Sequence, residues 1–236
     1  MTVDQPSIGR QLSRGSNPRI IGHAGCAGQY PENTITAVES AAPHVDGFEL
    51  DVRSCGTGEL VMFRDETLER VTNGTGRVDE TPLSDLRTLR VLESESSIPT
   101  LEELLRSISP STPINLELKE PGIESAALEI CKSAGISVLY SSFYESALRE
   151  LRRLDETAPI AVLCHEGFDD CLKLGEELDA VAFHPSLPLA VETDVVADAK
   201  ARDLAVNVWT AETEADVQRL RELDIDGIIT DRWDFF

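Results

Sequence analysis

Short apolar runs alternate with amphipathic stretches from about residue 19 to the end of the chain, and this rhythm restricts the possible folds most. A strand followed by a helix, repeated many times, predicts a parallel sheet, because a parallel crossover needs a dozen or more residues. The runs with the composition of buried strands are Arg19–Gly22, Gly47–Val52, Leu60–Phe63, Ile114–Leu118, Val138–Ser142, Ile160–Cys164, Ala180–Phe183, Ala205–Trp209 and Gly227–Thr230. The stretches with helical spacing of apolar residues are Glu32–Ala42, Leu83–Leu89, Leu101–Ser107, Gly122–Ala134, Glu145–Asp155, Asp169–Leu178, Glu192–Asp203 and Glu212–Leu223.

The second and third strand candidates are too close together for a parallel crossover. Only the Gly-containing segment Ser54–Glu59 separates them, so we expect a hairpin that places Glu49 opposite Arg64. Without the third candidate, eight strands remain, the number that closes a barrel. We therefore predict an α/β fold: one (β/α)₈ TIM barrel domain over residues 1–236, with a small inserted hairpin and helical arm at about residues 54–110.

The chain is strongly acidic, with 43 Asp and Glu residues against 21 Lys and Arg residues and a formal net charge of −22. Nucleic acids and anionic membranes bind proteins through Lys and Arg, so neither is an expected partner. Four of the basic residues are Lys and 17 are Arg. An acidic, Lys-poor composition predicts adaptation to high salt, where screening weakens self-repulsion. The alternative is an ordinary acidic cytoplasmic protein, and full folding in dilute buffer would exclude the halophilic interpretation.

Two further features bear on the compartment. Met1–Arg19 contains charges, Gly and Pro but no apolar run, and no stretch approaches the roughly 18 apolar residues of a membrane helix. We therefore expect a soluble, cytoplasmic protein. The five cysteines are scattered and lack a C-x₂-C pair, which predicts free buried thiols rather than disulfides or a zinc site; they are Cys26, Cys55, Cys131, Cys164 and Cys171.

Charged residues cluster where strands end, which is where barrel enzymes carry their active sites. Glu49 lies two residues before Asp51, and such residues point to the same side of a strand. The same spacing separates Glu117 from Lys119. Three converging carboxylates would raise one another's pKa values unless a cation lay between them, and oxygen ligands favour Mg²⁺ or Ca²⁺. Exposed strand-end charges, or ion pairs with Arg53 and Lys119, are the alternative interpretation.

A series of motifs runs in order from about residue 19 to residue 232. They are Ile21-Gly-His-Ala-Gly, Pro31-Glu-Asn-Thr, Gly47-Phe-Glu-Leu-Asp-Val, Val61-Met-Phe-Arg-Asp-Glu-Thr-Leu, Thr72-Asn-Gly-Thr-Gly, Pro99-Thr-Leu-Glu-Glu-Leu, Asn115-Leu-Glu-Leu-Lys, Val208-Trp-Thr and Asp226-Gly-Ile-Ile-Thr-Asp-Arg. Together they resemble the glycerophosphodiester phosphodiesterase family. The resemblance implies a metal-dependent barrel enzyme that cuts a small-molecule glycerophosphodiester into glycerol phosphate and an alcohol.

The resemblance also implies roles for particular residues. The implied metal ligands are Glu49, Asp51 and Glu117; the phosphate-contacting lysine is Lys119; the catalytic histidine is His23; and the aromatic residue beside the substrate is Trp209. Elementary chemistry agrees, because a cation and a lysine stabilise charge that grows on phosphate oxygens, and an imidazole transfers protons near neutral pH. The loops that follow the later strands should contact the alcohol, so we add Phe143 and His184 to the predicted substrate pocket.

Two positions depart from the family pattern. The histidine of its first motif is followed by arginine, whereas Ala24 follows His23 here, and Arg64 stands where the family has its second catalytic histidine. A guanidinium stays protonated and transfers no proton, but it binds phosphate oxygens well. We therefore hypothesise that Arg64 binds phosphate, and an Arg64→Ala protein with unchanged affinity for a phosphodiester would contradict this.

The exchange leaves one proton-transfer role open. His165 and His184 follow later strands and are candidates for it, as is a metal-bound water, although local hydrogen bonds could equally account for either histidine. His44, at a helix end, is not expected to take part. Three functions follow from this gap: a phosphodiesterase of altered efficiency, a cyclising phospholipase-D-like lyase, or a non-catalytic phosphodiester-binding protein. The oligomeric state has no sequence signal.

Overall fold

The computed structural model describes residues 17–236, so most of the segment expected to lack a targeting signal lies outside the described residues. The strands are β1 (Arg19–His23), β2 (Gly47–Ser54), β3 (Leu60–Met62), β4 (Ile114–Leu118), β5 (Val138–Ser142), β6 (Ile160–Cys164), β7 (Ala182–Pro185), β8 (Ala205–Ala211) and β9 (Gly227–Thr230). Their order in the sheet is β1-β9-β8-β7-β6-β5-β4-β2-β3. A further parallel pairing of β1 with β2, in which His23 lies beside Glu49, closes the ring.

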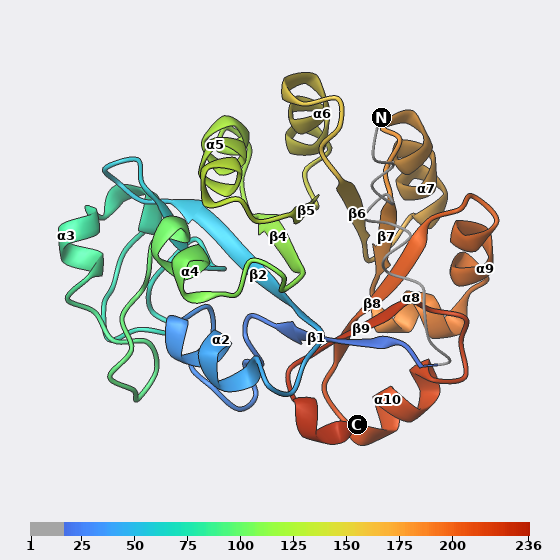
Figure 1. Ribbon diagram of the computed structural model, residues 1–236, viewed down its shortest axis with the longest axis horizontal. Coiled ribbons are helices and arrows are strands. Elements are labelled where there is room, and N and C mark those ends of the chain that lie inside the picture. Colours follow the sequence, from blue (N-terminus) through green and yellow to red (C-terminus); the bar gives the residue numbers. More distant parts are fainter. Residues whose placement is uncertain (1–16) are drawn as a thin grey trace, which may run out of the picture.

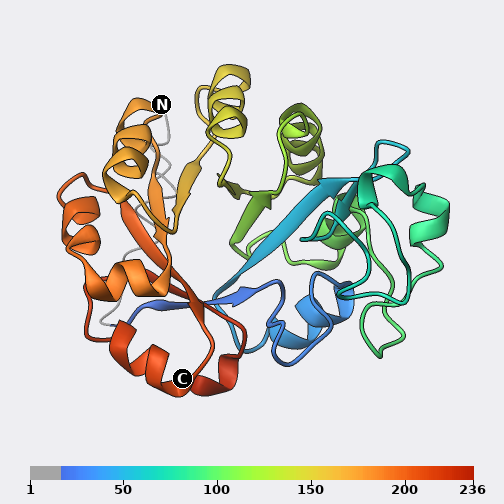
Figure 2. The ribbon, with the colours of Figure 1, turned by 180° about the vertical axis from the view of Figure 1, so that it is seen from behind.

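Helices surround this closed ring of strands, as both views in Figures 1 and 2 show. They are α2 (Ile35–Ala41), α3 (Leu83–Leu86), α4 (Leu101–Ser107), α5 (Glu124–Ala134), α6 (Glu145–Leu154), α7 (Phe168–Glu177), α8 (Leu187–Glu192), α9 (Val195–Lys200) and α10 (Glu214–Leu220), with 3₁₀ turns η1 (Val78–Glu80) and η2 (Trp233–Phe235). The predicted (β/α)₈ barrel is confirmed. Its strands are parallel except for β3, which pairs with β2 outside the ring.

Side chains along β2 and β4 point alternately away from the barrel interior and into it. Leu50 and Val52 point away from the barrel interior and belong to the main apolar core, with Leu116 of β4. The residues between them therefore face the interior, because successive side chains in a strand point to opposite sides. Glu49 and Asp51 are two of these interior residues of β2.

The hairpin between β2 and β3 exists, but its register differs from the predicted one. Val52 lies opposite Met62 and Ser54 opposite Leu60. Extending this register places Leu50, not Glu49, opposite Arg64, so the predicted pairing is wrong by one residue. Because Ser54 pairs with Leu60, the turn comprises residues 55–59, and within it Gly58 adopts a left-handed φ of 93°.

The segment after β3 forms the predicted arm, which projects to the left in Figure 1 around α3 and α4. It has a small apolar core of its own, separate from the main one: Cys55, Val61, Phe63, Leu68, Val71, Val78, Leu86, Val91 and Ile98. Its outer end is tied to the loop after β1 through Arg70, whose guanidinium donates to both carboxylate oxygens of Glu32 at 2.8 and 2.7 Å. The assignment of the whole chain to one domain stays a prediction.

Two predictions about later segments need correction. The stretch expected to form a helix from Glu192 to Asp203 contains only the shorter α9, and α8 before it was not predicted. The two helices are separate because the Thr193 hydroxyl bonds the carbonyl of Leu189 and accepts from the amide of Val195. Cys164 and Cys171 form a disulfide with their Cα atoms 6.2 Å apart, so the prediction of free thiols is wrong for this pair. The turn through Gly167, at a φ of 65°, brings the first turns of α7 back over the end of β6. The three remaining cysteines are free and buried, as predicted.

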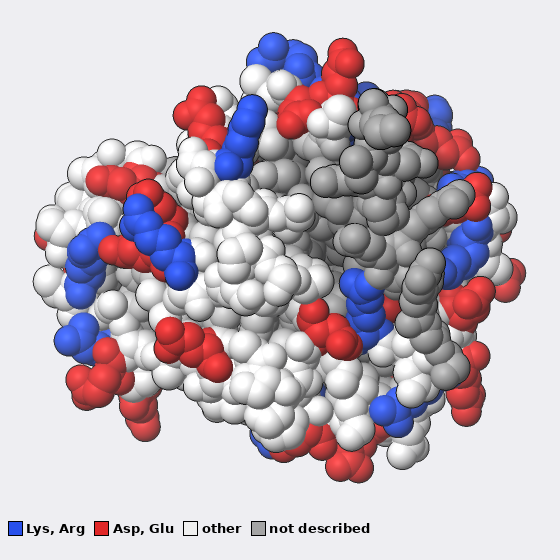
Figure 3. Space-filling model, in the orientation of Figure 1, with Lys and Arg blue, Asp and Glu red and all other residues white. Residues whose placement is uncertain are grey.

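The surface agrees with the composition. On the face shown in Figure 3, acidic and basic side chains alternate around the margin and uncharged side chains occupy the middle. Among residues 17–236, none of the helices is both long and apolar enough to cross a membrane. The halophilic and cytoplasmic interpretations stay predictions.

Candidate active site

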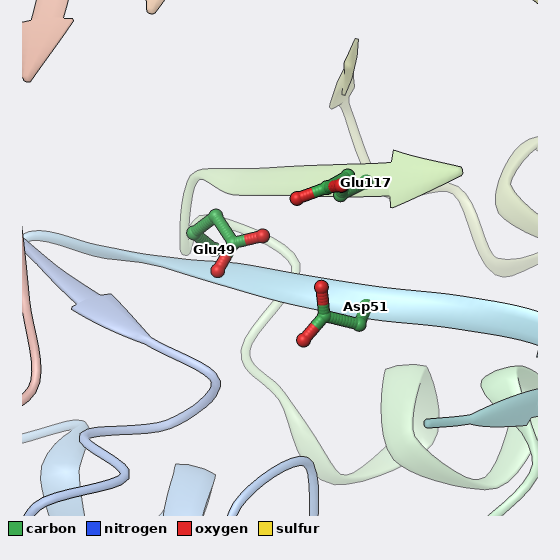
Figure 4. A group of neighbouring side chains, drawn as sticks. All are labelled: Glu49, Asp51 and Glu117. Carbon is green, nitrogen blue, oxygen red and sulfur yellow. The ribbon is translucent and has the colours of Figure 1, made fainter. Parts of the chain in front are cut away.

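Three buried carboxylates meet at the C-terminal mouth of the barrel. Asp51 pairs in register with Glu117 across β2 and β4, and Glu49 lies one step deeper on β2. Figure 4 shows the three side chains pointing toward one another from these two strands. One oxygen from each lies within 4.8 Å of the others, and the residues are only 3%, 1% and 7% exposed. The parallel register that brings β2 against β4 therefore creates a group that could hold a metal ion.

The charges of this group oppose one another. Burial, followed by repulsion from Asp51, raises the pKa of Glu49 to about 8. Burial and repulsion from Asp51 also raise the pKa of Glu117. Burial would raise the pKa of Asp51 as well, but Lys119 and His23 outweigh it and the net shift is downward. The expected mutual rise in pKa therefore holds for two of the three carboxylates, and the third keeps its charge because cations lie beside it.

Lys119 is the nearest of these cations. Its Nζ lies 2.5 Å from Oε1 of Glu117 and 3.5 Å from Oδ1 of Asp51. Burial by itself lowers the pKa of Lys119, but Asp51 and Glu117 together raise it, so the ammonium keeps its charge. Arg53, the other expected partner, turns away and pairs with Glu120 at 3.0 Å. Lys119 offsets one of the three carboxylate charges, and Oε1 of Glu49 is buried with no hydrogen-bond partner among the described residues.

Asn33 holds Asp51 from the side and was not predicted as a site residue. Its Nδ2 donates to Oδ2 of Asp51 at 2.9 Å, and its Oδ1 accepts from the Asp51 amide at 3.0 Å. Asn33 adopts a left-handed φ of 56°, a conformation that asparagine tolerates better than most residues. The Pro31-Glu-Asn-Thr motif around Asn33 was the sequence feature that could have indicated this role. Nothing in its spacing along the chain linked it to the carboxylates.

His23 ends β1 on the other side of the carboxylates. Its Nδ1 lies 2.6 Å from Oδ1 of Asp231, and its Nε2 lies 3.8 Å from Oε2 of Glu49. Burial by itself would lower the pKa of this histidine, but the hydrogen bond to Asp231 and the charges of Glu49, Asp231 and Asp51 raise it to about 9. Asp231 was expected at the end of the last strand, within the Asp226-Gly-Ile-Ile-Thr-Asp-Arg motif, but it was given no role in the predicted site, because 208 residues separate it from its partner.

Arg64 and two aromatic residues border the same pocket. The cavity between these side chains measures about 40 Å³, and its lining includes every predicted site residue except one; the predicted members are His23, Glu49, Asp51, Arg64, Glu117, Lys119, Phe143 and Trp209. Arg64 is exposed, forms no ion pair within residues 17–236, and contributes to lowering the pKa of Asp51. Such a cavity has room for an ion or a water, so a larger ligand would extend over the exposed residues at the rim.

The rim is aromatic on the side of β5 and β8. Phe143, which is 42% exposed, lies edge-on to Trp209 with ring centroids 5.5 Å apart. Its ring also meets the edge of His165 at 5.7 Å and lies 5.9 Å from Nζ of Lys119. His165 is therefore close to the mouth and exposed, although it does not line the pocket with the carboxylates.

His184 lies elsewhere than predicted. It is fully buried inside the barrel, and it does not line the pocket. Its Nε2 is 2.9 Å from the side-chain amide nitrogen, Nδ2, of Asn207. Burial lowers its pKa to about 3, so it is neutral. The physical reason is that its side chain is enclosed in the barrel interior, where it is held against the side chain of Asn207. Only its backbone meets the rim, where its carbonyl accepts from Nε1 of Trp209 at 2.8 Å.

A more spacious cavity, about 380 Å³, lies at the opposite end of the barrel between residues such as Phe48, Ile114 and Leu139. Its lining contains the charged side chains of Arg19 and Asp46 but no group of converging carboxylates. The mouth is therefore the place where titratable groups gather. Fold and mouth together define a (β/α)₈-barrel protein with a buried carboxylate group, a paired lysine and an aspartate-bound histidine.

Comparison with known proteins shows to which family this barrel protein is similar. The sequence model of the glycerophosphoryl diester phosphodiesterase family matches residues 23–235. A glycerophosphodiester phosphodiesterase from Bacillus altitudinis is 32% identical over 230 residues, which cover 90% of this chain and 94% of the relative. One from Caldanaerobacter subterraneus subsp. tengcongensis is 30% identical over 227 residues, covering 90% and 93%.

Solved structures agree. An Oleispira antarctica phosphodiesterase in complex with the product sn-glycerol-3-phosphate superposes with a TM-score of 0.83 at 29% identity, covering 91% of this chain and 93% of that one. The Thermotoga maritima glycerophosphodiester phosphodiesterase gives a TM-score of 0.79 at 27% identity, covering 94% and 98%. The chain belongs to the glycerophosphoryl diester phosphodiesterase family.

Proposed function

We propose that this protein hydrolyses a glycerophosphodiester to glycerol phosphate and an alcohol with the help of Mg²⁺ or Ca²⁺. The observation that carries the proposal is the convergence of Glu49, Asp51 and Glu117 within 4.8 Å at the barrel mouth, beside Lys119 and His23. Membership of the family supports the reaction, and the Oleispira antarctica structure supports glycerol phosphate as the product that the mouth would hold.

The carboxylate group fits a hard divalent cation. Its ligand atoms are all oxygens, the buried Oε1 of Glu49 lacks a partner, and burial with repulsion raises the pKa values of Glu49 and Glu117. A bound cation would offset that repulsion and draw electron density from a phosphate oxygen. Glu49, Asp51 and Glu117 are the residues proposed to hold it.

The cationic side chains would bind the phosphate. Lys119 lies beside two of the carboxylates, and Arg64 borders the pocket from the end of the hairpin. During displacement negative charge grows on the phosphoryl oxygens, and preorganised cations stabilise it most when water is excluded. We assign this role to both residues, with the guanidinium of Arg64 suited to two-point contact with a phosphate. Arg64→Ala should therefore weaken affinity for the phosphodiester.

His23 would transfer the protons. The attacking water must lose a proton as its oxygen bonds to phosphorus, and the alcohol oxygen must gain one as its bond to phosphorus breaks. Nε2 of His23 faces the carboxylate group, and no second imidazole lines the pocket in the described part of the chain. One imidazole serves both steps less well than two, so the enzyme should favour alcohols that leave easily.

The proposal is tested by hydrolysis assays with Mg²⁺ and separately with Ca²⁺, using glycerophosphocholine and an activated aryl phosphodiester. Turnover of both substrates that stops on chelation supports the proposal, and faster turnover of the activated ester supports the single-imidazole interpretation. Formation of a cyclic phosphate instead of glycerol phosphate would identify the lyase alternative. Tight metal-dependent binding without turnover of either substrate would identify the binding protein and overturn the proposed hydrolysis.

A further inference from the structure

Asp231 makes its one charged contact, among the described residues, with His23. Its Oδ1 lies 2.6 Å from Nδ1 of the imidazole, a short distance for a hydrogen bond between a nitrogen and an oxygen. The guanidinium of the next residue, Arg232, turns away and donates to Asp234 and to the carbonyl of Gly28. The carboxylate of Asp231 is therefore free of competing cations and acts on the imidazole alone.

Hydrogen bonds of Asp231 and of the residue before it hold the backbone at this position. Its carbonyl accepts from the amide of Gly28 at 3.0 Å, and Thr230 before it bonds the carbonyl of Ala211 at 2.8 Å. A Cβ at Gly28 would lie 3.1 Å from the carbonyl oxygen of Asp231, so the loop after β1 packs tightly over this residue. His23 itself ends a strand that pairs with β9. Donor and acceptor are thus fixed on two neighbouring strands.

The contact fixes which nitrogen of the imidazole faces the pocket. A carboxylate accepts hydrogen bonds only, so Nδ1 must carry a proton when it meets Asp231. In the neutral ring, the proton-accepting lone pair is then on Nε2, the nitrogen that faces Glu49 and the pocket. The opposite tautomer would present an N–H to the site and would be unable to take a proton from an attacking water.

Packing alone does not account for an aspartate at this position. Asp231 is 26% exposed on its side chain, so water could solvate it without a histidine. It also adds a negative charge on the other side of the His23 imidazole from Glu49, at a mouth that already holds three carboxylates. A neutral residue would not add to that charge. A role as the charged acceptor for the Nδ1–H of His23 accounts for an aspartate at this position.

We propose that Asp231 is a positioning residue: its carboxylate accepts the Nδ1–H of His23 and so directs Nε2 of the imidazole at the substrate. The inference deepens the proposed hydrolysis and rests on it for its kinetic part. Its structural part, the protonation of Nδ1, is independent of turnover. The chemical logic is that of an orienting carboxylate behind a general base.

The test compares Asp231→Asn with Asp234→Asn. Both changes remove one negative charge near the C-terminus, but Asp234 pairs with Arg232 and does not contact His23. For Asp231→Asn we expect kcat for glycerophosphocholine with Mg²⁺ to fall about 100-fold or more, with KM within about threefold. For Asp234→Asn we expect both constants within about twofold of wild type. Circular dichroism and thermal melting verify that each variant is folded.

A second measurement reads the contact directly. An Nδ1–H in a short bond to a carboxylate gives a strongly downfield proton resonance, which should be present in wild type and Asp234→Asn and lost in Asp231→Asn; loss in His23→Gln assigns it. Absence of this resonance in wild type overturns the proposal, as does an Asp231→Asn protein with unchanged kcat. A wild-type protein that shows the resonance but turns over nothing would overturn the proposed hydrolysis and leave the positioning intact.

Discussion

Two histidines of the same barrel, one part-buried and one fully buried, have opposite pKa shifts. His23, at the end of β1, lies between Asp231 and Glu49, and its pKa rises to about 9. The imidazole of His184, in β7, has only the side-chain amide of Asn207 as a polar partner within residues 17–236, and burial lowers its pKa to about 3. Burial acts in the same direction on both. The difference shows that neighbouring carboxylates, not depth in the barrel, decide which imidazole is charged.

The comparison extends to the two sides of the barrel. The acidic side, formed by the C-terminal ends of β1, β2, β4 and β9, carries all of the carboxylates that line the pocket, together with Lys119. The neutral side, formed by the ends of β5 to β8, supplies Leu163 and the aromatic rim of Phe143 and Trp209. Under the proposed function, metal and phosphate would contact the first side and uncharged parts of a substrate the second. Four predictions test this division, from the largest expected effect to the smallest.

Removing the charged imidazole should cost far more activity than removing the neutral one. His23→Gln is expected to lower kcat for a glycerophosphodiester about 1,000-fold, because general acid–base catalysis contributes roughly that much. His184→Gln should stay within about threefold of wild type, because its side chain does not line the pocket. Steady-state kinetics on both folded variants decides this. Equal losses of kcat in the two variants would contradict the difference in role between the two histidines.

Metal binding should stabilise the acidic side. At a metal concentration of about 100 times Kd, Mg²⁺ or Ca²⁺ should raise the free energy of unfolding by about 2.7 kcal/mol. Glu117→Gln should lose most of this gain, because it removes one ligand charge from the group. Glu166→Gln is the matched control, since Glu166 is 84% exposed beside the same mouth. Thermal or chemical denaturation with and without metal measures the effect, and equal stabilisation of both variants would contradict the site.

The neutral histidine should make the protein sensitive to acid. The pKa of His184 is about 3 when folded and near 6.5 when unfolded, so between these values the unfolded chain binds the extra proton. This contribution to stability is present above about pH 6.5 and falls as pH drops, by up to about 1.4 kcal/mol per pH unit. Urea denaturation at pH 6.5 and 5 should show a steeper loss for wild type than for His184→Gln. Parallel curves would contradict the assigned shift.

A second imidazole at the mouth should raise kcat for phosphodiesters whose alcohol is a poor leaving group. Arg64→His places a proton donor at the edge of the pocket and removes a phosphate contact, so KM should rise a few-fold. We expect kcat for glycerophosphocholine to increase about tenfold and kcat for an activated aryl ester to change little. A gain of the same size for both substrates would mean that leaving-group protonation is not the limiting step.

Much of the fold follows from sequence patterns that are local. Strands such as Gly47–Ser54 and Ile114–Leu118 could be located because their apolar runs are short and bounded, and the surplus strand could be identified because six residues cannot span a parallel crossover. Spacing of two within a strand also predicted that Glu49 and Asp51 share the interior. Boundaries were predicted less well: the hairpin register was wrong by one residue, α9 is shorter than the predicted helix, and α8 was not predicted.

The roles of individual polar residues depended on contacts between distant parts of the chain. The sequence by itself determined the barrel, the position of the carboxylates at its mouth and the presence of Arg64 beside them, because these follow from strand periodicity and strand order. The tertiary structure alone decided that Asp231 bonds His23, that Asn33 holds Asp51, that Cys164 bonds Cys171 and that His184 is buried and neutral. Each of these depends on depth and distance across the closed ring, which no local pattern records.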